Sequence, residues 1–193
     1  MRAFLPHQVR AWEYVRTRDR IALFMKMRLG KSIVTIRWAK HRLPPDANIL
    51  IVAPLSVLPG WLDELRLENE SGTILSGTSR QKMRALQNCT TRWVLINPEG
   101  FCARRKKRGE SRLPTSPMTL ALANIDWDCV ILDESTFITN PQSGITHTIL
   151  KEFKNVRCKA ILAGEPAPES SLDYFEQMAF LHGELLGCRT YYH

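Results

Sequence analysis

The sequence predicts a three-layer α/β fold, with a mainly parallel β-sheet covered by helices on both faces. Short apolar runs rich in β-branched residues alternate along the chain with segments of helical periodicity. The runs are apolar almost throughout, as in strands that are buried on both faces of a parallel sheet. The expected strands are residues 21–24, 49–53, 93–96, 129–132 and 160–163. The expected helices are residues 7–16, 32–41, 56–67, 79–87, 118–123 and 170–181.

The helix expected at residues 32–41 shows its period most clearly. Ile33 and Ile36 fall on one side, and Arg37 and Lys40 fall on the other. An apolar stripe of this spacing packs inward on a sheet. We therefore expect the two basic side chains to face solvent.

Local chemistry indicates where other elements begin and end. Ser56 suits the N-cap of the helix expected at 56–67, and Pro59 is tolerated in its first turn. Residues 103–117 hold two prolines, a glycine and many charges, which predicts a long exposed loop. A length of 193 residues suits one substantial core, so we expect a single domain over residues 1–193.

Composition narrows the class of protein. Hydrophobic residues make up 44% of the chain and charged residues 24%, as in ordinary globular proteins. No apolar run is long enough for a membrane span or a secretion signal, so no membrane partner is expected. The five cysteines form no Cys-x-x-Cys pair, which predicts neither a zinc site nor a disulfide framework. An intracellular, cytoplasmic protein is therefore expected.

The net charge of +8 is unevenly distributed. Residues 1–42 carry eleven Lys or Arg against Glu13 and Asp19, a balance of +9. A second basic run is Arg104, Arg105, Lys106, Lys107 and Arg108. Both concentrations suit a polyanion such as nucleic acid or a triphosphate. For the second run, a solvated loop is an equally good interpretation.

The sequence Gly30-Lys31-Ser32 lies between an expected strand and an expected helix, which is the setting of a phosphate-binding loop. Backbone N–H groups at the helix start face the phosphates, and Lys31 adds a cation. The Ser32 hydroxyl is placed to bind the Mg²⁺ that accompanies a nucleoside triphosphate. Met25 occupies the slot of the usual first glycine. The residues expected around the nucleotide phosphates are Met27, Arg28, Leu29, Gly30, Lys31 and Ser32.

The strand expected at 129–132 ends in two carboxylates, Asp133 and Glu134. In phosphate-loop enzymes the first carboxylate holds Mg²⁺ through water, and the next can orient or deprotonate the attacking water. Alone, the pair could simply cap a strand. Together with Gly30-Lys31-Ser32 it predicts ATP and Mg²⁺ binding, with hydrolysis as the chemistry and Lys31, Asp133 and Glu134 as catalytic residues.

Six segments in order now resemble the motifs of the first RecA-like lobe of superfamily-two helicases, within them the Swi/Snf-type translocases, including short phage-encoded members. The fold implied is the three-layer RecA-like lobe of phosphate-loop NTPases. The matching segments are residues 5–8, 27–32, 50–58 with Trp61 following, 94–99, 133–136 with its extension to 141, and 162–170 with the helix after it. For a phage-encoded member, the cytoplasm would be that of the host.

The resemblance assigns further roles. It implies that Gln8 reads adenine, although a surface glutamine is the alternative. Pro54, Leu55, Ser56 and Asn97 would contact a nucleic-acid strand. DNA is the expected partner, with RNA as the alternative, and backbone contacts of this kind do not read sequence. The segment expected to couple hydrolysis to strand binding is Gly164, Glu165 and Pro166. Trp12 and Trp61 could stack bases, but their helical spacing favours core positions.

Three positions depart from the family pattern. Arg28 occupies a position that is usually glycine. Thr136 replaces a usual histidine, so it can form hydrogen bonds but cannot titrate. Glu165 replaces a usual threonine, and a carboxylate near Asp133 and Glu134 is unfavourable unless it is protonated or bound to a cation. We therefore hypothesise that Glu165 weakens the link between hydrolysis and strand binding.

The resemblance also implies a second RecA-like lobe, in the same chain or in a partner, that supplies an arginine finger. Residues 1–193 do not include it, so weak or absent turnover is expected from this chain alone. Two rival functions remain open: a non-catalytic nucleic-acid-binding module that keeps the fold, and an unrelated phosphate-loop enzyme such as a small-molecule kinase. Residues 54–58 and 162–170 argue against the kinase.

Overall fold

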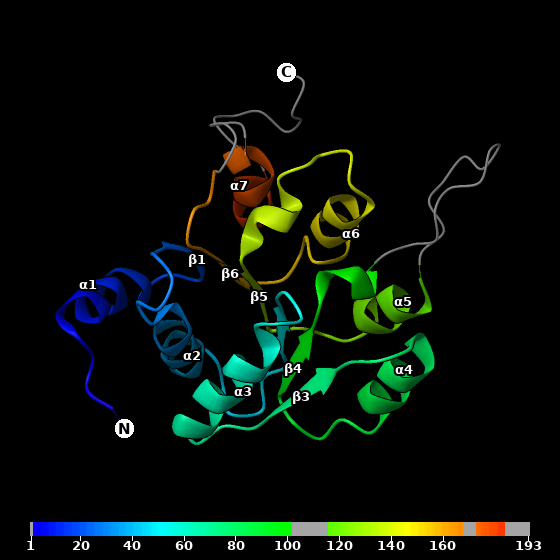
Figure 1. Cartoon of the computed structure of the whole chain (residues 1–193), viewed down its shortest axis with the longest axis horizontal. Coiled ribbons are helices and arrows are strands. Elements are labelled where there is room, and N and C mark those ends of the chain that lie inside the picture. The colour runs from blue at the N-terminus through cyan, green and yellow to red at the C-terminus, as the bar shows by residue number, and fades with distance from the viewer. Residues whose placement is uncertain (1, 102–115, 168–172, 184–193) are drawn as a thin grey trace.

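The computed structural model describes residues 2–101, 116–167 and 173–183. Its centre is a six-stranded sheet in the order β1-β6-β5-β2-β4-β3, and all neighbouring strands are parallel (Figure 1). The strands are β1 (Arg20–Phe24), β2 (Ile49–Val52), β3 (Gly72–Leu75), β4 (Trp93–Ile96), β5 (Cys129–Asp133) and β6 (Cys158–Ala163). The α/β class and the parallel sheet predicted from the sequence are confirmed.

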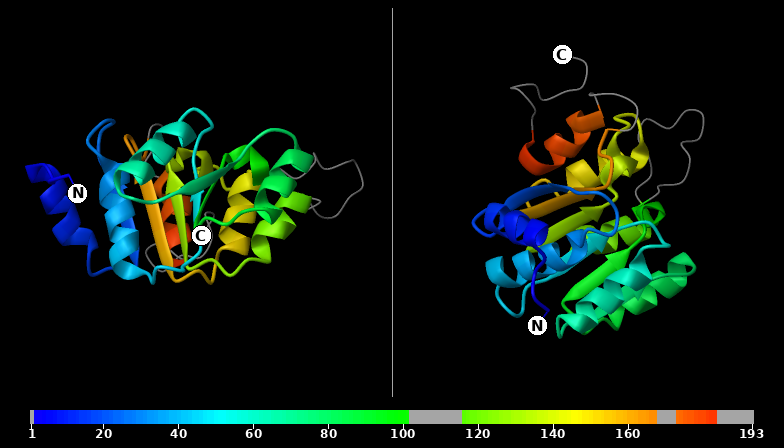
Figure 2. Two further views of the ribbon diagram at one scale, coloured as in Figure 1. Left: turned by 90° about the horizontal axis from the view of Figure 1, so that it is seen from below. Right: turned by 60° about the vertical axis from the view of Figure 1, so that its left-hand side comes forward.

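Helices cover both faces of the sheet (Figure 2). The helices are α1 (Pro6–Val15), α2 (Lys31–Arg42), α3 (Leu58–Leu67), α4 (Ser79–Gln87), α5 (Pro117–Ala123), α6 (Gly144–Glu152) and α7 (Tyr174–His182). Helices α1 to α3 pack with Ile49 and Ile51 of β2 in one core cluster, whereas α4 to α7 pack with Leu50 and Val52 in the other. Alternate side chains of one strand therefore serve opposite layers. Within the described residues, no helix is long and apolar enough to cross a membrane.

Three local features differ from the sequence prediction. Helix α3 begins at Leu58 with Val57 at its N-cap, so the assignment of Ser56 as the cap is wrong. Strand β3 was missed because it is a short edge strand that begins with Gly72 and is only partly buried. Helix α6 was missed because it begins with Gly144 and is rich in poor helix formers, although Ser143 caps it through the amide of Ile145. The helix expected from residue 170 begins at Tyr174, and residues 168–172 lie outside the described part.

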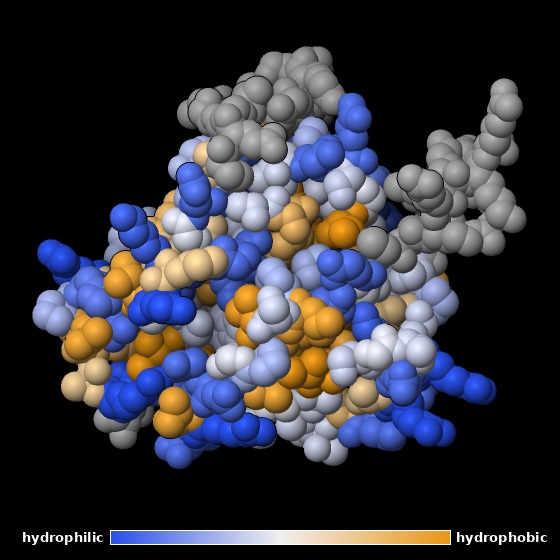
Figure 3. Space-filling view, in the orientation of Figure 1, coloured by the Kyte–Doolittle hydropathy of each residue, from blue (hydrophilic) through white to orange (hydrophobic). Residues whose placement is uncertain are grey.

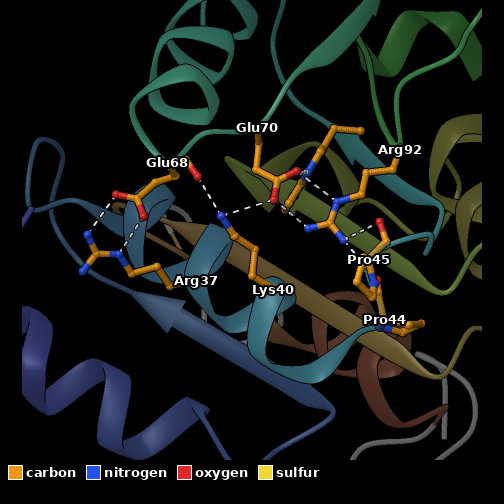
Figure 4. A network of polar contacts seen from close by, with 8 residues as sticks. Arg37, Lys40, Pro44, Pro45, Glu68, Glu70 and Arg92 are labelled. Atoms are coloured by element: carbon orange, nitrogen blue, oxygen red, sulfur yellow. Dashed lines mark hydrogen bonds and ion pairs between the residues drawn. The ribbon is translucent and has the colours of Figure 1, made fainter. Parts of the chain in front are cut away.

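Ion pairs attach α2, which begins at the phosphate loop, to the end of α3 and to the segment before β3 (Figure 4). The Arg37 guanidinium donates to both carboxylate oxygens of Glu68 at 2.9 Å. Lys40 Nζ lies 3.2 Å from Glu70 Oε1, which also accepts from Arg92 at 2.9 Å. The expectation that Arg37 and Lys40 face solvent is wrong. Both side chains are partly buried and form ion pairs with Glu68, at the end of α3, and Glu70, before β3. This network fixes the helix that carries Lys31.

The carboxyl ends of the six strands share one edge of the sheet, because all the strands are parallel. Figure 1 looks onto this edge, and in the left view of Figure 2 the loops after β1 and β2 rise on the same side. Apolar side chains gather near the middle of this face in Figure 3, over the loop that follows β2. Leu55 in that loop is 59% exposed.

Candidate nucleotide-binding site

The phosphate loop between β1 and α2 uses two left-handed backbone positions. Arg28 has φ 64° and Gly30 has φ 80°. A Cβ at Gly30 would lie 2.3 Å from Gln8 Nε2, so only glycine fits there. Arg28 stands where the family usually has glycine, and it adopts the conformation that glycine favours. The loop thus forms despite the substitution, at some cost in backbone strain.

Gln8 holds the segment before α1 against the phosphate loop. Its Oε1 accepts from the amide of Leu5 at 3.0 Å, and its Nε2 donates to the carbonyl of Leu29 at 3.2 Å. The residue is only 8% exposed, which excludes the alternative of a surface glutamine. Its role toward adenine stays a prediction. The observed hydrogen bonds show a structural role for Gln8, which fixes the loop around Gly30.

Lys31 is the first residue of α2, and its side chain is almost buried. Its Nζ donates to the carbonyl of Met25 at 3.0 Å and lies 3.8 Å from Glu134 Oε1. Ser32 follows in the first turn of the same helix and is half-buried. The structure therefore brings the amine of the phosphate loop to the acids of β5, residues that lie about a hundred positions apart in the sequence.

Asp133 ends β5 and is 4% exposed. Burial raises the pKa of this carboxyl, and the charge of Glu134 raises it further. Two donors oppose this rise: Trp61 Nε1 donates to Oδ2 at 2.8 Å, and the amide of Glu134 donates to Oδ1 at 3.0 Å. Lys31 also favours the charged form. A carboxylate held at both oxygens by fixed donors is suited to hold a hydrated cation in one orientation.

Glu134 has a strained backbone, with φ 50° and ψ 56°. A non-glycine residue in the left-handed region is uncommon and is often found at functional sites. Its side chain is half-buried beside Lys31 and lines a cleft of about 610 Å³. The other residues lining the cleft are Lys26, Met27, Thr136, Gly164 and Glu165. The predicted catalytic base thus opens onto a space that the phosphate loop also borders.

The donor set fits a magnesium-bound triphosphate. Among the described residues, no group of three or more His, Cys, Asp and Glu side chains could hold a metal ion by itself. A metal here would take one carboxylate, Asp133, one hydroxyl, Ser32, and oxygens from phosphate and water. Mg²⁺ prefers this arrangement in nucleotide sites.

The segment predicted to couple the two functions, Gly164 to Pro166, follows β6 and borders the same cleft. Glu165 is exposed there and lines the cleft together with Glu134. Pro166 is connected, through Gln177 of α7, to Ser135, which directly follows the acid pair Asp133 and Glu134. Gln177 is fully buried, and the sequence interpretation did not single it out. Two adjacent polar residues, Glu176 and Gln177, within a mostly apolar helix are the signal that could have identified it.

The residues predicted to contact nucleic acid lie on adjacent strand ends. Pro54, Leu55 and Ser56 follow β2 and are half-buried or exposed, and Asn97 follows the neighbouring strand β4. Asn97 Oδ1 accepts from Lys82 Nζ of α4 at 2.7 Å, which adds a cation that the sequence interpretation missed. The basic run at residues 104–108 lies outside the described part.

The preference for core positions is confirmed for Trp61 and modified for Trp12. Trp61 is 1% exposed and packs in the core, yet its indole N–H reaches Asp133, a functional contact that spacing alone could not predict. Trp12 is partly buried and packs between Phe4 and His41.

Fold and site together define the class. A parallel α/β sheet whose carboxyl edge joins a Gly-Lys-Ser loop to an Asp-Glu strand end is a RecA-like phosphate-loop domain. Comparison with known sequences gives the family: the chain matches the SNF2-related domain over residues 7–193 and belongs to that family.

Individual relatives are distant and much longer. The chain is 25% identical to human chromodomain-helicase-DNA-binding protein 7 over 162 residues, which are 81% of this chain and 5% of that protein. It is 27% identical to mouse chromodomain-helicase-DNA-binding protein 9 over 165 residues, or 81% and 6%. The Sulfolobus solfataricus SWI2/SNF2 ATPase core in complex with dsDNA superposes with a TM-score of 0.76 at 23% identity, covering 99% of this chain and 38% of that one. This likeness establishes the fold.

Proposed function

We propose that this chain is the ATP-binding lobe of a DNA-dependent ATPase that moves on nucleic acid when a second RecA-like lobe completes it. The observation that supports this most directly is the convergence of Lys31, Asp133 and Glu134, with Lys31 Nζ 3.8 Å from Glu134 Oε1. The second lobe would come from another part of a longer protein or from a partner chain. We propose an intracellular setting for this activity.

Each residue has a role that its position supports. The amides at the start of α2 and the amine of Lys31 bind the phosphates. Ser32 and Asp133 would hold Mg²⁺, which would neutralise phosphate charge. Glu134 accepts a proton from the attacking water, and Gln8 reads adenine while bracing the loop. The Lys31 ammonium, 3.8 Å from Glu134 Oε1, lies between this carboxylate and the start of α2 where the phosphates would bind.

The proposed nucleic-acid surface is the same edge of the sheet. The loop after β2, with Pro54, Leu55 and Ser56, adjoins Asn97 and the Lys82 ammonium. Backbone amides, hydroxyls and one cation recognise phosphates rather than bases, so the affinity should be independent of sequence and sensitive to salt. The Sulfolobus solfataricus core is in complex with dsDNA, and we extend that partner to this chain, with residues 104–108 as a further basic contact.

ATP hydrolysis with and without single- and double-stranded DNA tests the proposal, using the chain alone and joined to a second lobe of the family. Lys31→Ala should lose nucleotide binding, and Glu134→Gln should keep binding but lose turnover. Matched controls are Lys151→Ala and Glu152→Gln, an ion pair at the C-terminal end of α6, which should change neither. Salt-dependent DNA binding with no turnover in either form would favour a non-catalytic module. Binding of Mg²⁺-ATP that survives Lys31→Ala would contradict the assignment.

A further inference from the structure

Gln177 joins the end of β5 to the loop after β6. Its Oε1 accepts from Ser135 Oγ at 2.6 Å, and Ser135 directly follows Glu134. Its Nε2 donates to the carbonyl of Pro166 and, at 2.9 Å, to the carbonyl of Asp173 at the start of α7. Both Gln177 and Ser135 are 0% exposed. One side chain therefore connects the acid pair, the loop at Gly164 to Pro166, and a helix.

Only an amide can make this set of bonds. A carboxylate would accept from Ser135 but would face the two carbonyl oxygens of Pro166 and Asp173 without a donor. An apolar side chain would leave a buried hydroxyl and the Pro166 carbonyl without this partner, which is unfavourable in a dry site. The amide uses its acceptor and both donor hydrogens, so it cannot move away from one partner without losing a bond. The link is therefore stiff.

The two ends of the link lie in segments with different tasks. Ser135 is one residue from Glu134, which lines the nucleotide cleft beside Lys31. Pro166 is one residue from Glu165, which also lines that cleft. A nucleotide that draws the acid pair toward its metal would displace the Ser135 hydroxyl. Because the amide is held at all its polar atoms, the displacement passes to Pro166 and to the start of α7.

We infer that Gln177 is a positioning residue that transmits the nucleotide state of the acid pair to the loop at Gly164 to Pro166, and through it to the nucleic-acid surface. This inference rests on the proposed function. Gln177 touches neither nucleotide nor DNA. It acts by making one arrangement of Ser135 depend on one arrangement of Pro166, which is a coupling between two binding events.

The test measures that coupling directly on the full chain. Fluorescence anisotropy gives the affinity for a short labelled DNA duplex, with and without Mg²⁺ and a non-hydrolysable ATP analogue. The variants are Gln177→Met, which keeps length but not hydrogen bonds, Ser135→Ala, and the double variant. Thr146→Val is the matched control, because the Thr146 hydroxyl is buried and has no partner within the described part of the chain.

In the wild type and in Thr146→Val, the nucleotide should change DNA affinity by at least about fivefold. In each single variant the ratio should fall to near one, while each ligand alone binds within about threefold of wild type. The double variant should match the single variants, because all three remove one shared link. If Gln177→Met does not fold, Ser135→Ala alone decides the outcome.

A purely structural Gln177 would lower the melting temperature but leave the ratio intact, and that result would overturn the inference. A wild type that binds both ligands with no mutual effect would also overturn it, while leaving the proposed function in place. A wild type that binds no Mg²⁺-nucleotide would refute the proposed function and this inference with it.

Discussion

Removing the indole N–H of Trp61 by substitution is the strongest single test of the proposed metal site. Trp61→Phe keeps an aromatic ring in the core and removes the donor that lies 2.8 Å from Asp133 Oδ2. A hydrogen bond to a charged group contributes about 1.5–3 kcal/mol. Asp133 is a proposed metal ligand, and loss of a hydrogen-bond partner of a metal ligand typically weakens metal affinity about 10–100-fold. Trp61→Phe should therefore weaken the affinity for Mg²⁺ in the nucleotide complex by this factor.

The same variant should also change how the affinity for Mg²⁺ depends on pH. Burial already raises the pKa of Asp133, and the Trp61 bond opposes that rise. Removing the bond should raise the pKa further, so that protons compete better with Mg²⁺. The Mg²⁺ affinity of Trp61→Phe should therefore fall more steeply as the pH decreases than that of the wild type.

Calorimetric titration of ADP with Mg²⁺ and with EDTA measures this effect. Trp38→Phe is the matched control: Trp38 is fully buried, and its indole N–H donates at 2.8 Å to the carbonyl of Arg18, far along the chain from the acid pair. Both variants should lose some stability, but only Trp61→Phe should reduce the gain in ADP affinity that Mg²⁺ gives over EDTA. Equal dependence on Mg²⁺ in wild type and Trp61→Phe would refute the reasoning.

Three further predictions concern the loop, the ion pairs and the coupling segment. Arg28→Gly should raise the free energy of unfolding by about 0.5–1 kcal/mol in urea melts, because it relieves a left-handed non-glycine residue that costs about 1–2 kcal/mol. The control Arg10→Gly, inside α1, should instead lower the free energy of unfolding by about 1 kcal/mol. Hydrogen bonds from Arg37 hold the pKa of Glu68 below its usual value, so this pair stabilises the fold above about pH 4.3 and the stability is lost as the pH falls through the depressed folded-state pKa. Glu68→Gln should cost about 2 kcal/mol at neutral pH and flatten the acid limb of the melting curve; an unchanged acid limb would argue against it. Glu165→Thr should raise nucleic-acid-stimulated ATP turnover in the two-lobe form by about fivefold, and unchanged turnover would count against a weakening role for Glu165.

Patterns that depend on local periodicity could be predicted from the sequence. The five apolar strands follow from short apolar runs rich in β-branched residues, and the helix after Gly30 follows from its helical periodicity. The same rule missed β3, whose Gly72 and partial exposure leave little periodic signal. It also placed Arg37 and Lys40 in solvent, because the acids that bind them, Glu68 and Glu70, come from a different element.

The sequence could predict that the phosphate loop and the acids after β5 lie together, but not the contacts that surround them. Lys31 and Glu134 were predicted to converge because each follows a strand of one parallel sheet, and they do. The bonds from Trp61 to Asp133 and from Gln177 to Ser135 join residues 72 and 42 positions apart. Such contacts depend on how helices sit on the sheet. Spacing along one element carries no information about them.

A crystal structure of the chain with Mn²⁺ and ADP would test the central claim most directly. The account predicts anomalous density for the metal beside the Ser32 hydroxyl and the Asp133 carboxylate, with phosphate oxygens within hydrogen-bond distance of Lys31 Nζ. Metal and phosphates bound elsewhere would contradict it, for example in the cavity beside Lys40 and Arg92.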